Sequence, residues 1–580
     1  MEVRGLTVSF GSRTVVENLT YTLRRGETLG IVGESGSGKS VSTLALMGLL
    51  PLSATVKGSA LLYDNELLTL DDRQMQELRG KRISMIFQEP MTSLNPVQKC
   101  GNQVVEMMEA HRAKGMDKVS KKDDREKVID LFKEVKLPRP EKIFDSYPHE
   151  LSGGQKQRVM IAMALINHPD IIIADEPTTA IDVTVQKTIL ELLKQLQQKY
   201  GTSIIFITHD LGVIAQVADR IMVMYRGKVV EQGDAGDILH NPQHPYTRGL
   251  LACRPPLEGK PRRLPTVSDY LSENEQEGLT CKELSGDAVS EALEEVKKND
   301  EESVLTTGEP VKDSTASSKP LLSVRNLNVE YVLKKSFLGR PLQKLKAVDG
   351  ISFDLYRDET LGLVGESGCG KSTLGRAILR LIESKSESII FDGRRLDTLP
   401  ASEMRRLRTK MQIIFQDPYS SLNPRLTVGE AICEPLRVHK DRRGSQEKLK
   451  DRVVDLMERV GLRPEWYDRY PHQFSGGQRQ RICIARALIL NPELVICDES
   501  VSALDVSVQA QVLNLLNDLK EQFGFTYIFI SHDLSVVHFV SDRIMVMREG
   551  RIIEEGTTEE LYRSPREEYT RTLLEAIPRI

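Results

Sequence analysis

The chain of 580 residues has no apolar run near the roughly 18–20 residues that a membrane-spanning helix needs. Its first residues, MEVR, lack the charged-then-apolar plan of an export signal. Its seven cysteines are scattered without a CxxC pair, which argues against a disulfide framework and favours a reducing compartment. The two signs of charge nearly balance, because 79 basic and 83 acidic residues leave a net charge of −4. We therefore expect no global attraction to nucleic acid or anionic lipid.

Two glycine-rich loops are present, GESGSGKS and GESGCGKS, each between an apolar run and a segment with helical spacing. In this GxxxxGK[ST] pattern, backbone N–H groups wrap phosphates and the N-terminus of the following helix favours an anion. The lysine would reach the β- and γ-phosphates, and the last serine would bind Mg²⁺. The predicted phosphate-binding residues are Gly33, Ser35, Gly36, Gly38, Lys39 and Ser40 in the first half, and Gly365, Ser367, Gly368, Gly370, Lys371 and Ser372 in the second.

A pair of carboxylates ends an apolar run in each half, at Asp175–Glu176 and at Asp498–Glu499. Each aspartate would emerge at the carboxyl end of a strand, where ligands gather in parallel sheets. It would bind Mg²⁺ directly or hold the water ligands of the ion. Each glutamate would orient and deprotonate the attacking water.

A glutamine and a histidine complete the set in each half. Gln88 and Gln416, in IFQEP and IFQDP, would sense Mg²⁺ or the attacking water. His209 and His532 end apolar runs and would contact the γ-phosphate; a hydrogen-bonded structural histidine is the alternative. The predicted catalytic residues are Glu176, Glu499, His209, His532, Gln88 and Gln416, and the predicted metal-site residues are Ser40, Gln88, Asp175, Ser372, Gln416 and Asp498.

An SGGQ segment opens a predicted helix in each half. Ser152 and Gly154 belong to the first segment, and Ser475 and Gly477 to the second. The hydroxyl, the backbone N–H groups and the helix N-terminus would form a second anion site, whereas a flexible turn is the alternative for such a segment taken alone.

The motifs reveal a duplication. From SGGQ onward, equivalent residues of the two halves differ by 323 positions, as Asp175 and Asp498 do. We expect a first domain at 1–257, an acidic and largely flexible linker at 258–320, and a second domain at 321–580. Within the linker, RRLPTVSDYL is predicted to be an ordered extension of the first domain.

Within each half, short buried runs alternate with helical patterns, which predicts an α/β fold. The stretches Gly101–Phe144 and Val428–Tyr467 read as an inserted helical subdomain in each half. The second half also carries an insertion around Leu333–Leu345, between its first strand and its phosphate loop.

Together these motifs resemble the ATP-binding cassette (ABC) ATPases over nearly the whole chain outside the linker. The resemblance implies two tandem P-loop NTPase domains, each with a RecA-like core, an antiparallel β part and the helical subdomain. It also implies ATP and Mg²⁺ as cofactors, and ATP sites that each combine the phosphate loop of one cassette with the SGGQ segment of the other. No self-dimer is then needed. By resemblance, Phe10 and Tyr331 would stack on adenine, and Asp182 and Asp505 would belong to the loop that links the sites.

Finer strings, among them FQEPMTSLNP, YPHELSGGQ and HPYTRGLL, resemble the importers of oligopeptides, dipeptides and nickel. That subgroup implies two integral membrane permeases as partners, an extracytoplasmic binding protein as an indirect partner, and a place on the cytoplasmic face of the inner membrane. No nucleic acid is expected. Some members carry a cysteine cluster after HPYT, but only Cys253 and Cys281 follow it here, so we predict no iron–sulfur cluster.

One alternative is a tandem ABC ATPase that acts on ribosomes or nucleic acid. Such proteins typically have a basic helical linker or zinc-binding insertions, whereas the linker here is acidic. An ATPase that has lost its permeases is a further alternative. The cargo stays open among peptide, nickel, glutathione and other small solutes, because cassettes do not touch it.

Overall fold

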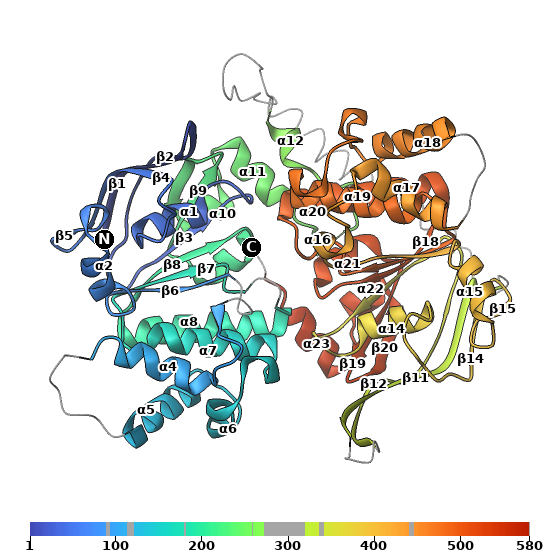
Figure 1. The fold of residues 1–580 in the computed structure, drawn as a ribbon, viewed down its shortest axis with the longest axis horizontal. Coiled ribbons are helices and arrows are strands. Elements are labelled where there is room, and N and C mark those ends of the chain that lie inside the picture. Colours follow the sequence, from blue (N-terminus) through green and yellow to red (C-terminus); the bar gives the residue numbers. More distant parts are fainter. Residues whose placement is uncertain are drawn as a thin grey trace. The chain divides into compact units, whose positions relative to one another are not determined.

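The structure, a computed structural model, describes residues 1–88, 93–112, 121–178, 181–257, 259–271, 319–335, 341–439 and 446–578. These residues form two units by their internal contacts. Of the described residues, the first comprises Met1–Leu251 with 267–271 and Pro578, and the second comprises Ala252–Thr266 with 319–577. Figure 1 colours both units along the sequence. Most of the predicted linker, 272–318, lies outside the described residues.

Each unit contains a six-stranded sheet and a four-stranded sheet. In the first unit the orders are β10-β9-β3-β8-β7-β6 and β2-β1-β4-β5. The strands are β1 (Glu2–Phe10), β2 (Arg13–Thr22), β3 (Thr28–Val32), β4 (Ala54–Leu62), β5 (Asn65–Glu66), β6 (Ile83–Ile86), β7 (Ile171–Asp175), β8 (Ser203–Thr208), β9 (Arg220–Tyr225) and β10 (Lys228–Asp234). In the large sheet, β6, β7, β8, β3 and β9 run parallel and β10 pairs antiparallel with β9.

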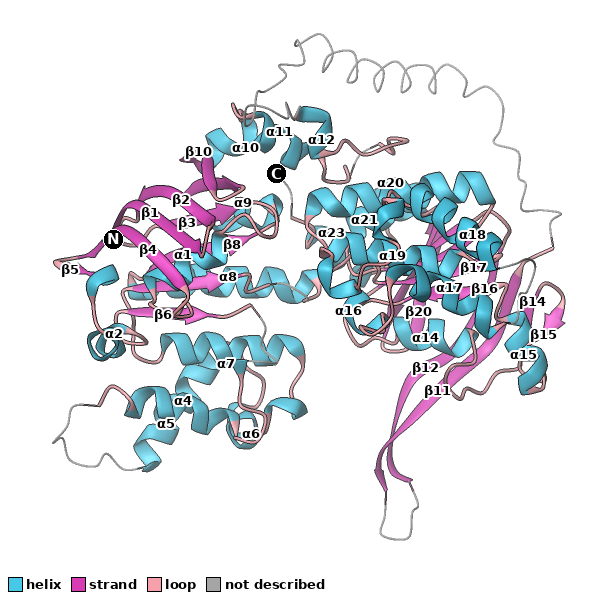
Figure 2. Ribbon diagram, turned by 45° about the horizontal axis from the view of Figure 1, so that its top comes forward, coloured by secondary structure: helices cyan, strands magenta, loops and turns pink. Residues whose placement is uncertain are grey.

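The helices of the first unit follow the predicted pattern. They are α1 (Lys39–Leu46), α2 (Asp72–Leu78), α4 (Cys100–Glu109), α5 (Lys121–Glu134), α6 (Pro140–Asp145), α7 (Gly153–Leu165), α8 (Val183–Tyr200), α9 (Leu211–Val217), α10 (Ala235–His240), α11 (Pro245–Ala252) and α12 (Val267–Tyr270), with short 3₁₀ turns η1 (Leu67–Thr69) and η2 (Pro148–Glu150). Figure 2 shows α4 to α7 gathered into a helical group of their own, which is the expected inserted subdomain.

The second unit repeats this plan, with sheets β16-β17-β18-β13-β19-β20 and β12-β11-β14-β15. Its strands are β11 (Leu322–Lys335), β12 (Pro341–Leu355), β13 (Thr360–Val364), β14 (Ser388–Phe391), β15 (Arg394–Arg395), β16 (Met411–Ile414), β17 (Leu494–Asp498), β18 (Thr526–Ile530), β19 (Arg543–Arg548) and β20 (Arg551–Thr557). Its helices are α14 (Lys371–Ile378), α15 (Ala401–Leu407), α16 (Pro418–Ser421), α17 (Val428–Val438), α18 (Gln446–Arg459), α19 (Gly476–Leu488), α20 (Val506–Phe523), α21 (Leu534–Val540), α22 (Thr558–Arg563) and α23 (Glu568–Glu575), with 3₁₀ turns η4 (Pro464–Trp466) and η5 (Pro471–Gln473).

The central strands form the core of each unit. Every residue of β3, β7, β13 and β17 is buried. Parallel strands covered on both faces read as continuous apolar runs, which is why TLGIV and IIIAD were recognisable as strands. The predicted α/β class with an antiparallel β part and an inserted helical subdomain is confirmed.

The insertion predicted in the second half lengthens a hairpin. Strands β11 and β12 have 14 and 15 residues, against 9 and 10 in β1 and β2. Figure 2 shows this ribbon extending beyond the other strands of its sheet. Residues 336–340, between the two strands, lie outside the described residues.

The segment that ends the predicted first domain and begins the predicted linker groups with the second unit. We call Ala252–Thr266 the strap; residue 258 within it is not described. Leu264 is 1% exposed, and its N–H donates to Asn514 Oδ1 at 2.9 Å while its carbonyl accepts from Asn514 Nδ2 at 2.8 Å. Lys260 Nζ donates to the Ser541 carbonyl at 2.7 Å. One asparagine side chain therefore pairs with both backbone groups of Leu264.

Two ion pairs add to the hydrogen bonds between the strap and the second unit. Arg262 lies 3.1 Å from Glu521, and Arg263 lies 3.9 Å from Asp518, with both acids on α20. The prediction that RRLPTVSDYL extends the first domain is wrong for its first part, because the strap groups with the second unit. Only 267–271 groups with the first unit. The pairing depends on an asparagine 250 positions away, which no local pattern reveals.

Candidate active site

The predicted site residues of each unit gather at one edge of the large sheet. In the first unit the phosphate loop follows β3, Gln88 follows β6, Glu176 follows β7 and His209 follows β8. These four strands are parallel neighbours, so their carboxyl ends meet at the same edge. Equivalent strands β13, β16, β17 and β18 place the second set in the same way. Ligands of open α/β sheets bind at this edge.

The phosphate loop of the first unit is held by its own lysine. Lys39 Nζ donates to the carbonyls of Gly33 and Glu34 at 2.6 and 2.9 Å. Gly38 has φ 98°, a left-handed conformation in which a side chain would be strained, and α1 begins at the next residue. The loop therefore aims the amides at the start of α1 toward a ligand.

The second loop has the same bonds. Lys371 Nζ donates to the carbonyls of Gly365 and Glu366 at 2.7 and 2.9 Å, and Gly370 has φ 109°. Cys369 Sγ lies 3.9 Å from Lys371 Nζ and is 8% exposed. Of the remaining predicted residues, Ser35, Gly36, Ser367 and Gly368 lie in these two turns, whereas Ser40 and Ser372 lie in the first turns of α1 and α14.

A hydroxyl and a carboxylate stand together next to each loop. Ser40 Oγ donates to Asp175 Oδ1 at 2.9 Å, and Ser372 Oγ donates to Asp498 Oδ1 at 2.6 Å. Burial raises the pKa of both aspartates, against the opposing effect of the serine bonds. A desolvated carboxylate next to a hydroxyl is an oxygen donor set that fits Mg²⁺.

Asp498 gives the most direct evidence that these residues suit Mg²⁺. Asp498 is fully buried, and its Oδ2 has no hydrogen-bond partner among the residues that the structure describes. The Arg376 guanidinium lies 3.7 Å from this oxygen, which is beyond hydrogen-bond distance. A buried, unbonded carboxylate oxygen is costly without a compensating charge, which a divalent cation would supply.

Each predicted base is contacted by both of its predicted neighbours. Gln88 Nε2 donates to Glu176 Oε2 at 2.9 Å, and His209 Nδ1 lies 3.3 Å from Glu176 Oε1. Sequence reasoning placed these three side chains in one site but did not foresee that they bond to one another. The glutamine and the histidine leave the carboxylate few orientations, which suits a group that must align a water molecule.

The second unit repeats the cluster. Gln416 Nε2 donates to Glu499 Oε2 at 2.7 Å, and His532 Nδ1 lies 3.4 Å from the same oxygen. Both glutamates adopt left-handed backbone conformations, with φ 45° at Glu176 and 48° at Glu499. Such angles are uncommon outside glycine and are found at functional sites. A sequence gives no signal for this strain, because glutamate has no preference for that conformation.

The His532–Glu499 pair is electrostatically coupled. Burial would lower the pKa of His532, but the bond and charge of Glu499 raise it above its ordinary 6.5. Burial would raise the pKa of Glu499, but His532 brings it below its ordinary 4.5. The histidine contribution is complete below pH 6.5 and is lost as pH rises through the raised pKa. The glutamate contribution is present above pH 4.5 and is lost as pH falls, so the pair stabilises the fold most between these values.

We expect His532→Gln to destabilise the nucleotide-free protein more at pH 6 than at pH 9. Glutamine keeps a donor for Glu499 but cannot carry the charge. The loss in the melting temperature of the second unit should be greater at pH 6 by about 2–4 °C, as for a difference of about 1 kcal/mol. Thermal unfolding at both pH values measures it. His472→Gln, which changes a histidine stacked on Tyr470, is the control; equal losses at the two pH values for His532→Gln would contradict the prediction.

The SGGQ segments cap helices in both units. Ser152 Oγ accepts from the Gln155 amide and the Gln155 side chain accepts from the Ser152 amide, which is a reciprocal capping box at the start of α7. A Cβ added to Gly154 would lie 2.6 Å from Val185 in the first turn of α8, so only glycine fits there. Asp182 caps that helix.

The second SGGQ segment has the same construction. Ser475 and Gln478 form the capping box of α19, and a Cβ at Gly477 would lie 2.2 Å from Val508 in α20. Asp505 stands at the N-cap of α20. Each SGGQ turn is therefore packed against the start of the next long helix of its own unit.

The aromatic residues assigned to adenine lie on the smaller sheets. Phe10 ends β1 and is half-buried against the first core. Tyr331 lies in β11 and is 42% exposed. Both therefore belong to the antiparallel β part of their own unit.

Cys253, one of the two cysteines after HPYT, is buried, and Cys281 lies outside the described residues. Within the described ranges, with their gaps, no helix has the length and hydropathy of a membrane span.

Comparisons with known proteins agree with the geometry. The family model described as "ABC transporter" matches residues 16–179 and 348–502. The chain belongs to the ABC transporter family. A second model, "Oligopeptide/dipeptide transporter, C-terminal region", matches 230–282 and 553–580. The predicted pair of ABC ATPase domains and the importer subgroup are thus confirmed.

The chain is similar over its full length to proteins named glutathione import ATP-binding protein GsiA. The relative from Salmonella typhimurium is 47% identical over 594 residues, covering 100% of this chain and 89% of that protein. The relative from Escherichia coli K12 is 48% identical over 576 residues, covering 97% and 86%. A solved cassette, MJ0796 bound to ADP and Pi, is 27% identical with a TM-score of 0.37, covering 41% of this chain and 98% of that one.

These matches confirm the prediction of an ATP-hydrolysing subunit that energises a membrane importer of peptides or a related small solute. They give no support to the alternative of a tandem ATPase acting on ribosomes or nucleic acid.

Proposed function

We propose that this ABC ATPase drives the import of glutathione or a similar short peptide. The observation that carries the proposal is the full-length similarity to the glutathione import proteins, in which both halves and both C-terminal regions align. The short sequence strings do not distinguish peptide importers from nickel importers. The similarity to the glutathione import proteins extends over the whole chain, and we therefore favour glutathione among the solutes left open.

Hydrolysis would use the residues of the two clusters. The ammonium groups of Lys39 and Lys371 already lie within the loops, where they donate to backbone carbonyls. When ATP binds, they would donate to the β- and γ-phosphates instead. Mg²⁺, when bound by the serine hydroxyls and aspartates, would neutralise charge on the phosphates. Glu176 and Glu499 then orient a water molecule for in-line attack and accept its proton.

The neighbouring side chains would keep each base in position. The glutamine amide donates to one carboxylate oxygen in each unit, and the histidine ring lies within ion-pair distance of the carboxylate. When the γ-phosphate is present, the imidazole would turn its other nitrogen toward it. Catalysis of this type rests on positioning and charge stabilisation more than on covalent chemistry.

We extend the proposal to composite sites, on the strength of the family resemblance. Lys39, Asp175, Glu176 and His209 would share one ATP with Ser475 and Gly477. Lys371, Asp498, Glu499 and His532 would share the other with Ser152 and Gly154. The capped helix N-termini at the two SGGQ segments are suited to an anion. Adenine stacking on Phe10 and Tyr331 belongs to the same proposal. So do the limits 1–257 and 321–580 as the sequence extents of the two cassettes, with the last residues of the first, Ala252–Leu257, packed in the second unit.

The partners would be two integral membrane permeases, which the helical subdomains contact, and an extracytoplasmic binding protein that delivers cargo. The chain would therefore act at the cytoplasmic face of the inner membrane as a peripheral subunit.

A cellular uptake experiment tests the cargo. Cells that lack the gene should lose most uptake of radiolabelled glutathione, and a plasmid carrying the wild-type chain should restore it. The chain with both Glu176→Gln and Glu499→Gln should not restore it, which ties uptake to hydrolysis. Parallel assays with a labelled dipeptide and with ⁶³Ni²⁺ serve as comparison cargoes. Normal glutathione uptake in the deleted strain, with loss of one of the others, would overturn the assignment.

A further inference from the structure

The C-terminal part of each half reaches back to the phosphate loop. Tyr246, in the HPYT segment, accepts a hydrogen bond from the Glu34 amide at 3.0 Å. Tyr569, its equivalent in EEYT, accepts one from the Glu366 amide at 3.2 Å. These tyrosines stand 212 and 203 positions from the loops they contact. The same contact in two halves that differ at most positions marks it as part of the plan of the site.

The contact fixes Glu34, which also binds the phosphate-loop lysine. The Glu34 carbonyl accepts from Lys39 Nζ at 2.9 Å, while its amide donates to Tyr246. In the second loop Glu366 is held in the same way by Lys371 and Tyr569. Each tyrosine therefore helps to fix the start of the loop. Because the same glutamate accepts from the lysine, the tyrosine also helps to fix the position of the lysine ammonium group.

The rings are anchored by packing that differs between the halves. Tyr246 is fully buried and its ring lies 4.3 Å from that of Tyr225. Position 548, equivalent to Tyr225, holds an arginine whose guanidinium lies 4.8 Å from the Tyr569 ring. Burial raises the pKa of Tyr569 well above its ordinary range, so its hydroxyl stays protonated at neutral pH. The tyrosine and its bond to the loop are kept although the support around the ring has changed.

A carboxylate on the last strand fixes the turn before each tyrosine. Glu231 of β10 accepts from the amides of Gln243 and His244 at 2.6 and 3.2 Å. Glu554 of β20 accepts from the amides of Arg566 and Glu567 at 2.7 and 3.2 Å.

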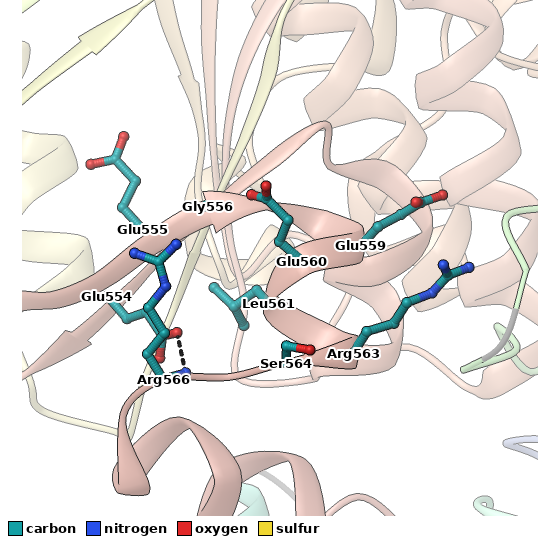
Figure 3. Close-up of a pocket in the computed structure, with 9 residues that line it drawn as sticks. All are labelled: Glu554, Glu555, Gly556, Glu559, Glu560, Leu561, Arg563, Ser564 and Arg566. Carbon is teal, nitrogen blue, oxygen red and sulfur yellow. Dashed lines mark hydrogen bonds between the residues drawn. The ribbon is translucent and has the colours of Figure 1, made fainter. Parts of the chain in front are cut away.

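Figure 3 shows the bond between Glu554 and Arg566 at the wall of a pocket formed by β20 and α22. None of the predicted site residues lines this pocket. Glu554 also accepts from the Thr570 hydroxyl at 2.5 Å, next to Tyr569. A chain of bonds thus runs from the last strand of the large sheet, through the C-terminal segment, to the phosphate loop.

We propose that Tyr246 and Tyr569 are positioning residues of the two ATP sites, which hold the phosphate loops through the amides of Glu34 and Glu366. The C-terminal region of each half is then part of the nucleotide site as well as a feature of the importer subgroup. The inference rests on the assignment of these loops to ATP and is independent of the cargo.

The test is the full-length chain with Tyr246→Phe and Tyr569→Phe together, and each change alone. Phenylalanine keeps the ring but removes the hydroxyl that accepts from the amide of Glu34 or Glu366. We expect the double variant to bind ATP about 5- to 20-fold more weakly, with KM raised by a similar factor and kcat changed less than threefold. Fluorescent-nucleotide titration and steady-state ATPase assays measure the two effects.

Tyr527→Phe is the matched control. Tyr527 is a buried tyrosine of the second unit whose hydroxyl donates to the Leu516 carbonyl at 3.4 Å, away from the loop. It should lose some stability but keep its ATP affinity. Hydrogen exchange supplies a readout that does not depend on activity: the peptide containing Glu366 should exchange faster in Tyr569→Phe and at the wild-type rate in Tyr527→Phe.

The outcomes are distinguishable. Wild-type ATP affinity and wild-type exchange at the loops in the Tyr→Phe variants would overturn the proposal. So would equal losses in Tyr569→Phe and Tyr527→Phe, which would indicate general destabilisation. If the double variant does not fold, the single variants are read by exchange at the affected loop. Loss of glutathione uptake plays no part in this test, so a wrong cargo would leave the result standing.

Discussion

The full-length chain with both Glu176→Gln and Glu499→Gln should hydrolyse ATP at least about a hundredfold more slowly than the wild type, while still binding it. Glutamine has the shape of glutamate, and its amide oxygen can still accept from Gln88 and Gln416, so the loops and their lysines are undisturbed. It cannot take a proton from water at neutral pH. Steady-state phosphate release and ATP binding, measured on the same preparation, give the two numbers.

Exposed glutamates of the same units provide the control. Glu191→Gln on α8 and Glu458→Gln on α18 remove the same two charges from outside the clusters and should leave turnover unchanged. Near-normal hydrolysis in the Glu176→Gln, Glu499→Gln chain would show that neither carboxylate is the base. Loss of ATP binding together with hydrolysis would show that the change had damaged the loops and would reject the assigned role.

The second large effect concerns how the two halves divide the ATP sites. In the hydrolysis-deficient chain, Lys39→Ala should remove one site. Adding Ser475→Glu, which places a carboxylate against the phosphates of that same proposed site, should then leave about one trapped ATP per chain. Adding Ser152→Glu instead should leave none, because it damages the site of Lys371. A glutamate at a helix N-cap is compatible with the helix dipole, so the fold should persist.

The number of ATP molecules that remain after rapid gel filtration distinguishes the models. If each cassette used its own SGGQ segment, the two combined variants would exchange their ATP retention. Lys39→Ala with Ser152→Glu would then retain ATP, and Lys39→Ala with Ser475→Glu would not. Equal retention in the two variants would contradict both arrangements.

The sequence predicted the parts of the site that follow directly from strand ends. The loops, the carboxylate pairs and the two histidines each end a short apolar run, and parallel strands bring such ends to one edge. The repeat then supplied a second copy in register, which separated these residues from chance matches. For this reason the α/β class, the inserted helices and the position of the insertion in the second half were all predictable, whereas its form, a longer β11–β12 hairpin, was not.

What the sequence did not predict depends on pairs of distant residues. The bond from Tyr246 to the Glu34 amide joins two different motifs, each of which was recognised separately. Glu176 has a left-handed backbone that glutamate does not favour, and its N–H donates a hydrogen bond to the carbonyl of Ile207, on the neighbouring strand, at 3.0 Å. A pattern in one sequence reports local preference, whereas these features are properties of the assembled sheet.

The strap has a consequence for dividing the gene. A second half produced separately from residue 319 would lack a peptide that its own fold buries, and Asn514 would lose both partners on Leu264. If an ancestral fusion joined two genes, the strap would have changed from an intersubunit support into an intrachain one. A later fission would make the opposite change. Co-expression of 1–271 with 319–580 should therefore yield a more thermostable C-terminal fragment than expression of 319–580 alone.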